Sequence, residues 1–358
     1  MSLSIGIVGL PNVGKSTLFN ALTKNQVPAE NYPFNTIDPN VGVVPVHDDR
    51  LNKITEIEKP EKTVPAVIQF VDIAGLVRGA HKGEGLGNMF LSHIREVDAI
   101  VQVVRAFESS DIIHVENRVD PRSDIETLET ELVLKDLEAV EKKWGQVEKD
   151  RSVDDKIKTF TKGLFEHLGN GKLAFGYDKE NSDIDVKKFR KELFLLTDKP
   201  LIYLVNQSVS KHASEEMKKL AAELNGEVLF LDIKVESELS NLDEEEKKEY
   251  LSELGMERSG FEKLTQTAYR LLGLISFFTS GPQEVRAWTI KNGAKAPEAA
   301  GAIHTDFEKK FIAADTVSYD DFVNFGGWEG AREKGKVRLE GKEYSVKDGD
   351  VMLFRHNA

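Results

Sequence analysis

Residues 9–16 read GLPNVGKS and match the phosphate-binding pattern G-x-x-x-x-G-K-[ST]. The apolar run 5–8 precedes this segment and a helix-like stretch follows it, which is the strand–loop–helix context that confirms the pattern. In such a loop, backbone N–H groups surround the α- and β-phosphates, Lys15 reaches the β- and γ-phosphates, and Ser16 offers its hydroxyl to Mg²⁺. The sequence therefore predicts a site for a nucleoside triphosphate.

Two segments further along the chain complete a GTPase-like arrangement. Asp72-Ile73-Ala74-Gly75 follows the apolar run 67–71, so that Asp72 can hold Mg²⁺ through water and the N–H of Gly75 can bond the γ-phosphate. Thr36, in a loop-like stretch, is placed to be the second hydroxyl on Mg²⁺. A phosphate loop, a threonine and D-x-x-G in this order are typical of GTPase switch regions. Lys15 and Gly75 are therefore catalytic candidates.

The residue after D-x-x-G departs from Ras-type enzymes, which place a glutamine there to orient the attacking water. Leu76 stands at this position, and a leucine cannot hydrogen-bond a water. Another group must assist, or hydrolysis is very slow. His81 and His114 are candidates, with a surface histidine of no catalytic role as the alternative for each. Asn12 could also coordinate a K⁺ that supplies positive charge beside the phosphates.

The base-recognition segment departs from the GTPase pattern as well. The apolar run 201–205 leads into Asn206-Gln207-Ser208-Val209, where guanine-specific proteins carry N-K-x-D. Val209 offers no acceptor to guanine, and an unpaired buried polar group costs about 1–3 kcal/mol. Asn206 can still bond N7 of a purine, and backbone groups near Gln207 can serve the amine of adenine. The segment favours ATP over GTP.

The wider pattern predicts an α/β fold. Strand-length apolar runs alternate with amphipathic stretches; these runs are 5–8, 67–71, 99–104, 201–205 and 228–231. Such alternation predicts a P-loop domain with a mostly parallel sheet and helices on both faces. The alternation of strand and helix signals stops between 127 and 196. There apolar residues recur at coiled-coil spacing, at Val133, Leu137, Val140, Trp144 and Val147. Beyond Gly281, short β-like runs and turns predict a small α+β module.

These boundaries predict three domains. A nucleotide-binding domain covers 1–126 and 197–280, an inserted helical or coiled-coil domain covers 127–196, and the α+β domain covers 281–358. The alternative for 127–196 is that its helices are simply those of the α/β domain. Because no strand signal interrupts these roughly 70 residues, and connections between strands are normally short, we prefer the insertion.

Composition excludes several classes of function. The 358 residues carry 48 Lys+Arg and 61 Asp+Glu, a net charge of −13, which rules out a uniformly basic nucleic-acid coat but not a local basic patch. The absence of cysteine excludes disulfides, cysteine-ligated zinc, iron–sulfur clusters and thiol nucleophiles. No apolar run approaches the ~20 residues of a membrane span, and the N-terminus lacks a basic n-region. We expect a cytoplasmic protein without membrane or DNA partners.

With these residues in view, the sequence closely resembles the YchF family, the Obg-like ATPases. The segments that carry the resemblance are GLPNVGKSTLFNALT at 9–23, NYPFNTIDPNVG at 31–42, DIAGLVRGAHKGEGLGN at 72–88, DAIVQVVRAFE at 98–108, EVRAWTI at 284–290, KAPEAAGAIHTDFEKKFI at 295–312 and DGDVMLFR at 348–355. The resemblance implies an Obg-type P-loop domain, an inserted coiled-coil domain and a C-terminal TGS domain. It also implies weak ATP hydrolysis, binding to the ribosome or its large subunit, and a role in translation and stress responses.

The resemblance also assigns residues. It implies nucleotide contacts at Asn12, Val13, Gly14, Lys15, Ser16 and Thr17, and adenine contacts at Asn206 and Gln207. It implies Mg²⁺ on Ser16 and Thr36, and assistance to hydrolysis from His114. Two positions differ from the family: Val209 replaces an acidic residue, and Asn35 replaces a cysteine that many members carry.

Two other functions stay open at this stage. One is a GTPase of the same fold; the other, motivated by Leu76, is a nucleotide-gated scaffold that does not hydrolyse the nucleotide.

Basic residues gather in two parts of the sequence. They lie in the insertion, at Lys142, Lys143, Lys149, Arg151, Lys156 and Lys158, and in the last module, at Lys309, Lys310, Arg332, Lys334, Lys336 and Arg338. Either group could meet ribosomal RNA phosphates, with solvated helix faces and hairpin edges as the alternative.

Overall fold

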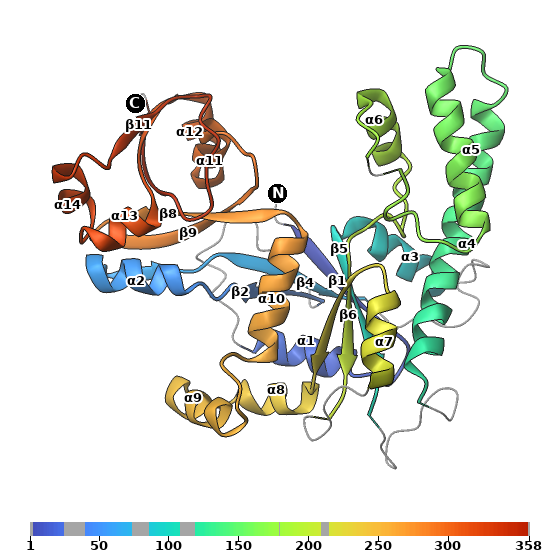
Figure 1. The fold of residues 1–358 in the computed structure, drawn as a ribbon, viewed down its shortest axis with the longest axis horizontal. Helices are drawn as coiled ribbons and strands as arrows, with labels where there is room; N and C mark the ends of the chain where they lie inside the picture. The colour runs from blue at the N-terminus through green and yellow to red at the C-terminus, as the bar shows by residue number, and fades with distance from the viewer. Residues whose placement is uncertain are drawn as a thin grey trace. The chain divides into compact units, whose positions relative to one another are not determined.

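The computed structural model describes residues 3–24, 40–73, 86–107, 119–178, 180–208 and 215–356 (Figure 1). The chain forms two compact units. Of the described residues, the first unit comprises those within 3–24, 40–42 and 69–260, and the second comprises those within 43–68 and 261–356. None of the described helices combines the length and apolar character needed to cross a membrane.

The strands β1, β5, β6 and β7 of the first unit belong to a six-stranded sheet of order β2-β4-β1-β5-β6-β7. The strands are β1 (Ser4–Val8), β2 (Val41–Pro45), β4 (Val67–Asp72), β5 (Ala99–Arg105), β6 (Leu201–Asn206) and β7 (Glu227–Leu231). β1 pairs in parallel with β4 and β5, and β6 pairs in parallel with β5 and β7. All five apolar runs predicted as strands are therefore confirmed, whereas β2 was not predicted. Parallel strands bring their carboxyl ends to one edge, where β1 enters the phosphate-binding loop.

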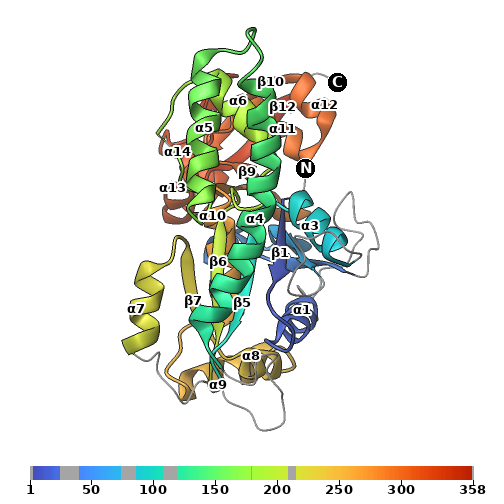
Figure 2. The same cartoon turned by 90° about the vertical axis from the view of Figure 1, so that its right-hand side faces the viewer.

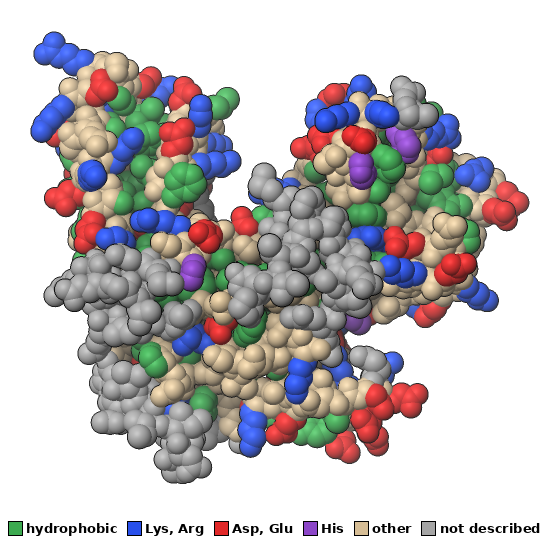
Figure 3. Space-filling model, turned by 180° about the vertical axis from the view of Figure 1, so that it is seen from behind, with side chains coloured by type: hydrophobic (Ala, Val, Ile, Leu, Met, Phe, Trp, Pro, Cys, Tyr) green, Lys and Arg blue, Asp and Glu red, His purple; other side chains and the backbone are tan. Residues whose placement is uncertain are grey.

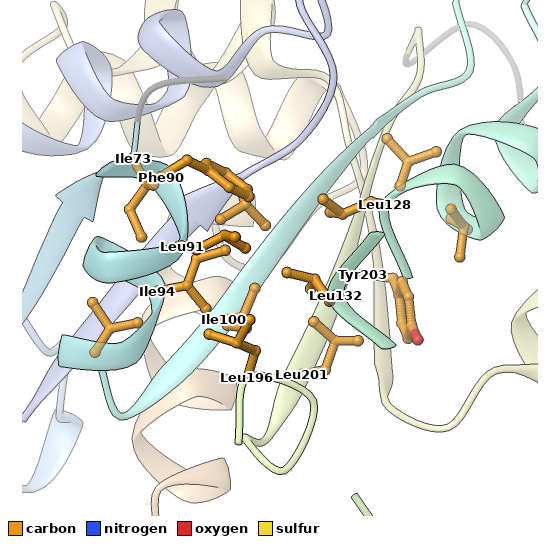
Figure 4. Close-up of a cluster of buried hydrophobic side chains, with 14 of the residues drawn as sticks. Ile73, Phe90, Leu91, Ile94, Ile100, Leu128, Leu132, Leu196, Leu201 and Tyr203 are labelled. Atoms are coloured by element: carbon orange, nitrogen blue, oxygen red, sulfur yellow. The ribbon is translucent and has the colours of Figure 1, made fainter. Parts of the chain in front are cut away.

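The core of this unit lies between the sheet and its helices. Every residue of β5 and β6 is buried, which explains why both strands read as continuous apolar runs rather than alternating ones. Phe90 and Leu91 of α3 (Leu86–Glu96) and Leu128 of α4 (Pro121–Val147) pack over these strands (Figure 4). The other helices are α1 (Lys15–Thr23), α7 (Glu215–Glu223), α8 (Ile233–Leu239) and α9 (Glu244–Glu253).

A helical hairpin extends the first unit. α4 is one continuous helix of 27 residues that lies alongside α5 (Asp155–Gly169) (Figures 1 and 2). Its Leu132 belongs to the core over the sheet, whereas Val133 and Val140 pack with α5 and α6 (Ile184–Glu192). The predicted helical seam is thus confirmed at its buried valines. The predicted domain start at residue 127 falls inside α4, so the same helix serves both cores; the division into three domains remains a prediction.

Buried polar bonds mark the point where α4 passes from one core to the other. The carboxylate of Asp136 is 2% exposed and accepts hydrogen bonds from Leu196 N at 2.9 Å, Thr197 N at 2.8 Å and Thr197 Oγ1 at 2.6 Å. Burial raises the pKa of Asp136 to about 6 despite these bonds. The first half of α4 is also held by the hydroxyl of Tyr203, which donates to Glu129. α4 is therefore fixed to β6 and to the segment before it.

The second unit contains a mixed six-stranded sheet of order β11-β10-β12-β8-β9-β3. The strands are β3 (Lys62–Val64), β8 (Leu274–Ser280), β9 (Glu284–Lys291), β10 (Phe311–Val317), β11 (Arg338–Glu340) and β12 (Val351–His356). The helices are α2 (Asp49–Glu58), α10 (Gly260–Leu271), α11 (Ala296–Ile303), α12 (Thr305–Lys309), α13 (Tyr319–Asn324) and α14 (Trp328–Glu333). Phe277, Ala299 and Met352 belong to its core.

α2 and β3 lie in this second unit, although the sequence predicts residues 1–126 within the nucleotide-binding domain. The physical reason is that β3 pairs in parallel with β9 and α2 packs on β8 and β9. Arg50 of α2 also bonds Asp348 through Nη1 at 2.8 Å and Nη2 at 3.1 Å. Such pairing between distant segments leaves no local pattern in the sequence.

Candidate nucleotide-binding site

The phosphate-binding loop joins β1 to α1 and needs glycine at two positions. Gly9 has φ 152° and Gly14 has φ 107°, in the region that side chains disfavour. A Cβ at Gly9 would lie 2.5 Å from the backbone oxygen of Val103, and one at Gly14 would lie 2.8 Å from Nδ2 of Asn206. Both glycines therefore allow the loop to lie against neighbouring strand ends, as the sequence pattern predicts.

Lys15 extends inside this loop. Its side chain is buried, and Nζ donates a hydrogen bond to the backbone oxygen of Leu10 at 2.7 Å. Burial lowers the pKa of Lys15, and the nearby carboxylate of Asp72 raises it in part. Burial in turn raises the pKa of Asp72, and the charge of Lys15 lowers it. A bound triphosphate would add negative charge here and stabilise the ammonium form of Lys15.

The remaining loop residues and Asp72 gather at the same edge of the sheet. Ser16 and Thr17 are exposed in the first turn of α1, and Asp72 is the last residue of β4, in register with Ile7 of β1. A hydroxyl, a carboxylate and substrate phosphates form the kind of oxygen set that Mg²⁺ uses. No group of three or more His, Asp or Glu side chains that could hold a metal ion occurs within the described ranges. The residues present fit an ion bound jointly with a nucleotide.

Asn206 clamps the loop from the end of β6. Its Nδ2 donates to the backbone oxygen of Val13 at 3.0 Å, and its Oδ1 accepts from the N–H of Ile233 at 3.2 Å. The side chain is 6% exposed. The amide therefore links the phosphate loop to the start of α8, a positioning role that the sequence did not predict. The predicted contact of Asn206 with a purine remains a prediction.

Gln207 lies beside a small pocket. Its backbone N–H donates to the oxygen of Leu231 at 2.8 Å, which holds it at the ends of β6 and β7. The pocket has a volume of about 100 Å³ and is lined by Gln207, Phe230, Leu231, Asp232, Val235, Glu236 and Met256. The predicted base-recognition segment therefore begins at the edge of the sheet that carries the phosphate loop.

Three predicted site residues lie outside the described residues: Thr36, Gly75 and His114. The same applies to Leu76, His81 and Val209, on which the arguments about water activation and base choice depend. The roles of all six therefore remain predictions.

Arg105 is a residue at this edge that sequence reasoning missed. It ends β5, is 1% exposed and lies in register with Asn206. Its Nε donates to the backbone oxygen of Phe107 at 3.1 Å, and its guanidinium lies 4.4 Å from the centre of the Phe107 ring. These contacts fix the backbone where the chain leaves β5. The only sequence signal was a charged residue directly after an apolar run.

The basic cluster of the insertion is partly occupied by contacts within the chain. Nζ of Lys156 lies 2.7 Å from a carboxylate oxygen of Asp183, and Nζ of Lys143 lies 5.3 Å from the centre of the Phe189 ring. In the face shown in Figure 3, basic and acidic side chains are interspersed over the described surface. The predicted contacts with RNA phosphates therefore have fewer available cations in the insertion than the sequence indicates.

The fold and the loop geometry define a P-loop protein of the GTPase-like class, and comparisons with known proteins agree. Residues 4–143 match a family described as 50S ribosome-binding GTPase, and residues 274–357 match the C-terminal YchF-GTPase family, described as a protein of unknown function. The chain is 53% identical to the ribosome-binding ATPase YchF of Bacillus subtilis, with all of both chains covered. It is 45% identical to Obg-like ATPase 1 of Gallus gallus, covering 99% of this chain and 93% of that protein.

A solved structure extends the similarity to the fold. The Schizosaccharomyces pombe YchF GTPase superposes with a TM-score of 0.88 at 40% identity, covering 99% of this chain and 98% of the other. This chain belongs to the YchF family.

Proposed function

We propose that this protein is an ATP-hydrolysing molecular switch that binds the ribosome through its large subunit and acts in translation or stress responses. The observation that supports it most strongly is the loop of residues 9–16, with Lys15 buried inside and Asn206 clamping it. The names of the relatives, ribosome-binding ATPase and Obg-like ATPase, support the choice of nucleotide and partner. Val209 supports adenine over guanine because it offers no acceptor.

Each residue of the proposed site has its own role in nucleotide binding or hydrolysis. The loop N–H groups and Lys15 bind the phosphates, and the positive end of α1 favours their negative charge. Ser16 and Thr36 would ligate Mg²⁺, and Asp72 would hold it through water. When bound, Mg²⁺ withdraws charge from the phosphate oxygens. Gly75 donates its N–H to the γ-phosphate, and His114 assists the attacking water in place of the missing glutamine.

The remaining features follow from the family and the charge pattern. A K⁺ at Asn12 would add positive charge beside the phosphates and raise a low basal rate. Basic residues of the insertion and of the C-terminal module, which we propose to be a TGS domain, contact ribosomal RNA. We place the protein in the cytoplasm, where ribosomes are found.

Ribosome binding is tested by sedimentation of the purified chain with ribosomes, at increasing salt, with an ATP analogue, a GTP analogue or ADP. We expect nucleotide-dependent co-sedimentation that weakens steeply with salt, because phosphate contacts release counterions. Binding that does not respond to nucleotide would contradict a switch, and binding independent of salt would contradict the RNA contacts.

A GTPase of the same fold is the second candidate. The family description of residues 4–143 and the name of the Schizosaccharomyces pombe relative favour it. Parallel titrations with non-hydrolysable ATP and GTP analogues separate the two candidates. Tighter binding of the ATP analogue supports our proposal, and much tighter binding of the GTP analogue would replace it by the GTPase.

A further inference from the structure

Helix α6 presents a row of lysines outside the basic clusters named from the sequence. Val186 is 2% exposed and Phe189 packs against the same core, so one face of α6 is buried on the helical hairpin beside α5 (Figure 1). Because an α-helix has about 3.6 residues per turn, the opposite face carries Lys187, Lys188 and Lys191. All three lysines are exposed. This face of α6 is therefore open to a partner.

The positive charge of this face is not compensated by ion pairs. None of the three lysines forms an ion pair with the described residues. Asp185 and Glu192 lie on the flank next to Lys188, whereas Lys187 and Lys191 occupy the other flank, one turn apart. Like charges at this spacing repel each other. The face therefore favours an anionic partner.

Two exposed apolar side chains lie at the ends of this face. Ile184, the first residue of α6, is 80% exposed, and Phe194, which follows the helix C-cap, is 71% exposed; these are the highest values among the large apolar side chains of the described residues. Phe194 also has φ 48°, a left-handed conformation that glycine normally supplies after a helix and that bulky residues avoid. Neither its exposure nor its backbone conformation stabilises the fold, which points to a functional role for the ring.

The order of charged and apolar groups distinguishes between anionic partners. In protein interfaces, apolar anchors form the centre and charged residues the rim. α6 has the opposite order, with lysines at the centre and with Ile184 and Phe194 roughly 15 Å apart at the ends. Single-stranded RNA matches this order, because its backbone offers phosphates to the lysines and its unpaired bases stack on aromatic rings. A duplex matches less well, because its bases are already stacked on one another.

We propose that α6 binds single-stranded RNA, with Lys187, Lys188 and Lys191 on the phosphates and the ring of Phe194 stacked on an unpaired base. The RNA contact of the insertion then lies on α6 rather than on the basic cluster between Lys142 and Lys158. The proposal rests on the proposed function for the source of this RNA, the ribosome. RNA binding itself requires neither ATP hydrolysis nor an assembled ribosome, so the two can fail separately.

The first test removes the charges of α6. Fluorescence anisotropy of a labelled ten-nucleotide oligouridylate, titrated with the full chain at several salt concentrations, gives the affinity and its salt dependence. For Lys187→Gln/Lys188→Gln/Lys191→Gln we expect at least about tenfold weaker binding. The slope of log affinity against log salt should be shallower by about 2, since each lost phosphate contact contributes roughly 0.7. The melting temperature should not fall, because all three side chains are exposed.

The matched control is Lys142→Gln/Lys149→Gln/Lys162→Gln, which removes the same charge from exposed lysines of the hairpin outside α6. It should keep the salt dependence of the wild type and nearly its affinity. An equal loss in the control, no loss in the α6 variant, or no saturable binding by the wild type would overturn the proposal. So would displacement of the RNA by octaglutamate as efficient as displacement by unlabelled RNA, which would indicate an acidic protein segment as the partner.

The second test concerns the ring of Phe194. Phe194→Ala should weaken binding of the oligouridylate about tenfold without changing its salt dependence, because stacking is lost while the phosphate contacts remain. Phe194→Trp should restore the affinity. The control is Ile184→Ala, which removes an exposed apolar side chain without a ring and should bind as the wild type does. Equal losses in the two alanine variants, failure of Phe194→Trp to restore binding, or equally tight binding of a GC-rich RNA duplex of the same length would rule out stacking on an unpaired base.

Discussion

The phosphate-binding loop and the helical hairpin belong to the same unit but are stabilised in different ways. The loop depends on backbone geometry at Gly9 and Gly14 and on the amide of Asn206. The hairpin depends on spread apolar packing around Val140 and on one buried carboxylate, Asp136. Specific bonds in the loop leave a short motif in the sequence, whereas distributed packing leaves only a periodicity. The variants below test this difference, from the largest expected effect to the smallest.

Lys15→Ala should have the largest effect. Because it removes the cation nearest the β- and γ-phosphates, hydrolysis should fall at least about 100-fold. Phosphate release from ATP under single-turnover conditions measures this, with Lys24→Ala, an exposed residue just after α1, as the control. Equal rates for wild type and Lys15→Ala would favour the non-hydrolysing scaffold.

The sequence predicted more of the sheet and the loop than of the rest. β5 and β6 are buried along their whole length, so their apolar character is unmistakable, and residues 9–16 carry a motif that chemistry constrains. The partners of β3 and α2 were not predicted, because their pairing with β9 and β8 involves residues more than two hundred positions away. The buried contacts of Asp136 and Arg105 were not predicted, because a single charged residue in a helix or at a strand end is normally solvated.

Asp136→Asn tests the attachment of the hairpin through its pH dependence. Burial raises the folded-state pKa of Asp136 from 3.8 to about 6, so between these values the folded protein binds more protons than the unfolded chain. The wild-type free energy of unfolding should therefore fall, relative to that of the variant, by about 2 kcal/mol as pH rises from about 4 to 7.

Urea unfolding of both proteins across this pH range measures the difference. The variant is the control, since its amide does not titrate. A difference that is constant with pH, or that grows as pH rises, would contradict the account of Asp136.

Asn206→Ala removes both bonds of the clamp, to Val13 and to Ile233. We expect nucleotide affinity to fall about tenfold, because each buried group left unpaired costs about 1–3 kcal/mol. Asn206→Asp keeps the acceptor for Ile233 and loses the donor to Val13, so it should separate the two bonds. Calorimetric titration with a non-hydrolysable ATP analogue gives the affinities. Unchanged affinity in Asn206→Ala would show that the loop keeps its shape without the clamp.

Gly163→Ala should have the smallest effect. An ideal Cβ at Gly163 of α5 would lie 2.0 Å from the hydroxyl of Tyr177 and would therefore displace it. The overpacking should cost about 1–3 kcal/mol, partly offset by the roughly 1 kcal/mol that alanine gains over glycine in a helix. The control is Gly145→Ala on α4, where nothing lies within 4 Å, so only the gain applies. Thermal unfolding should show a lower melting temperature for Gly163→Ala and a higher one for Gly145→Ala. The same shift in both variants would mean that the Tyr177 side chain moves aside at little cost.

ATP hydrolysis by the purified full chain in Mg²⁺ and K⁺, with and without ribosomes, tests the central claim most directly. The account predicts slow hydrolysis of ATP that ribosomes accelerate and that Lys15→Ala abolishes under both conditions. Hydrolysis absent even with ribosomes, or retained by Lys15→Ala, would contradict it.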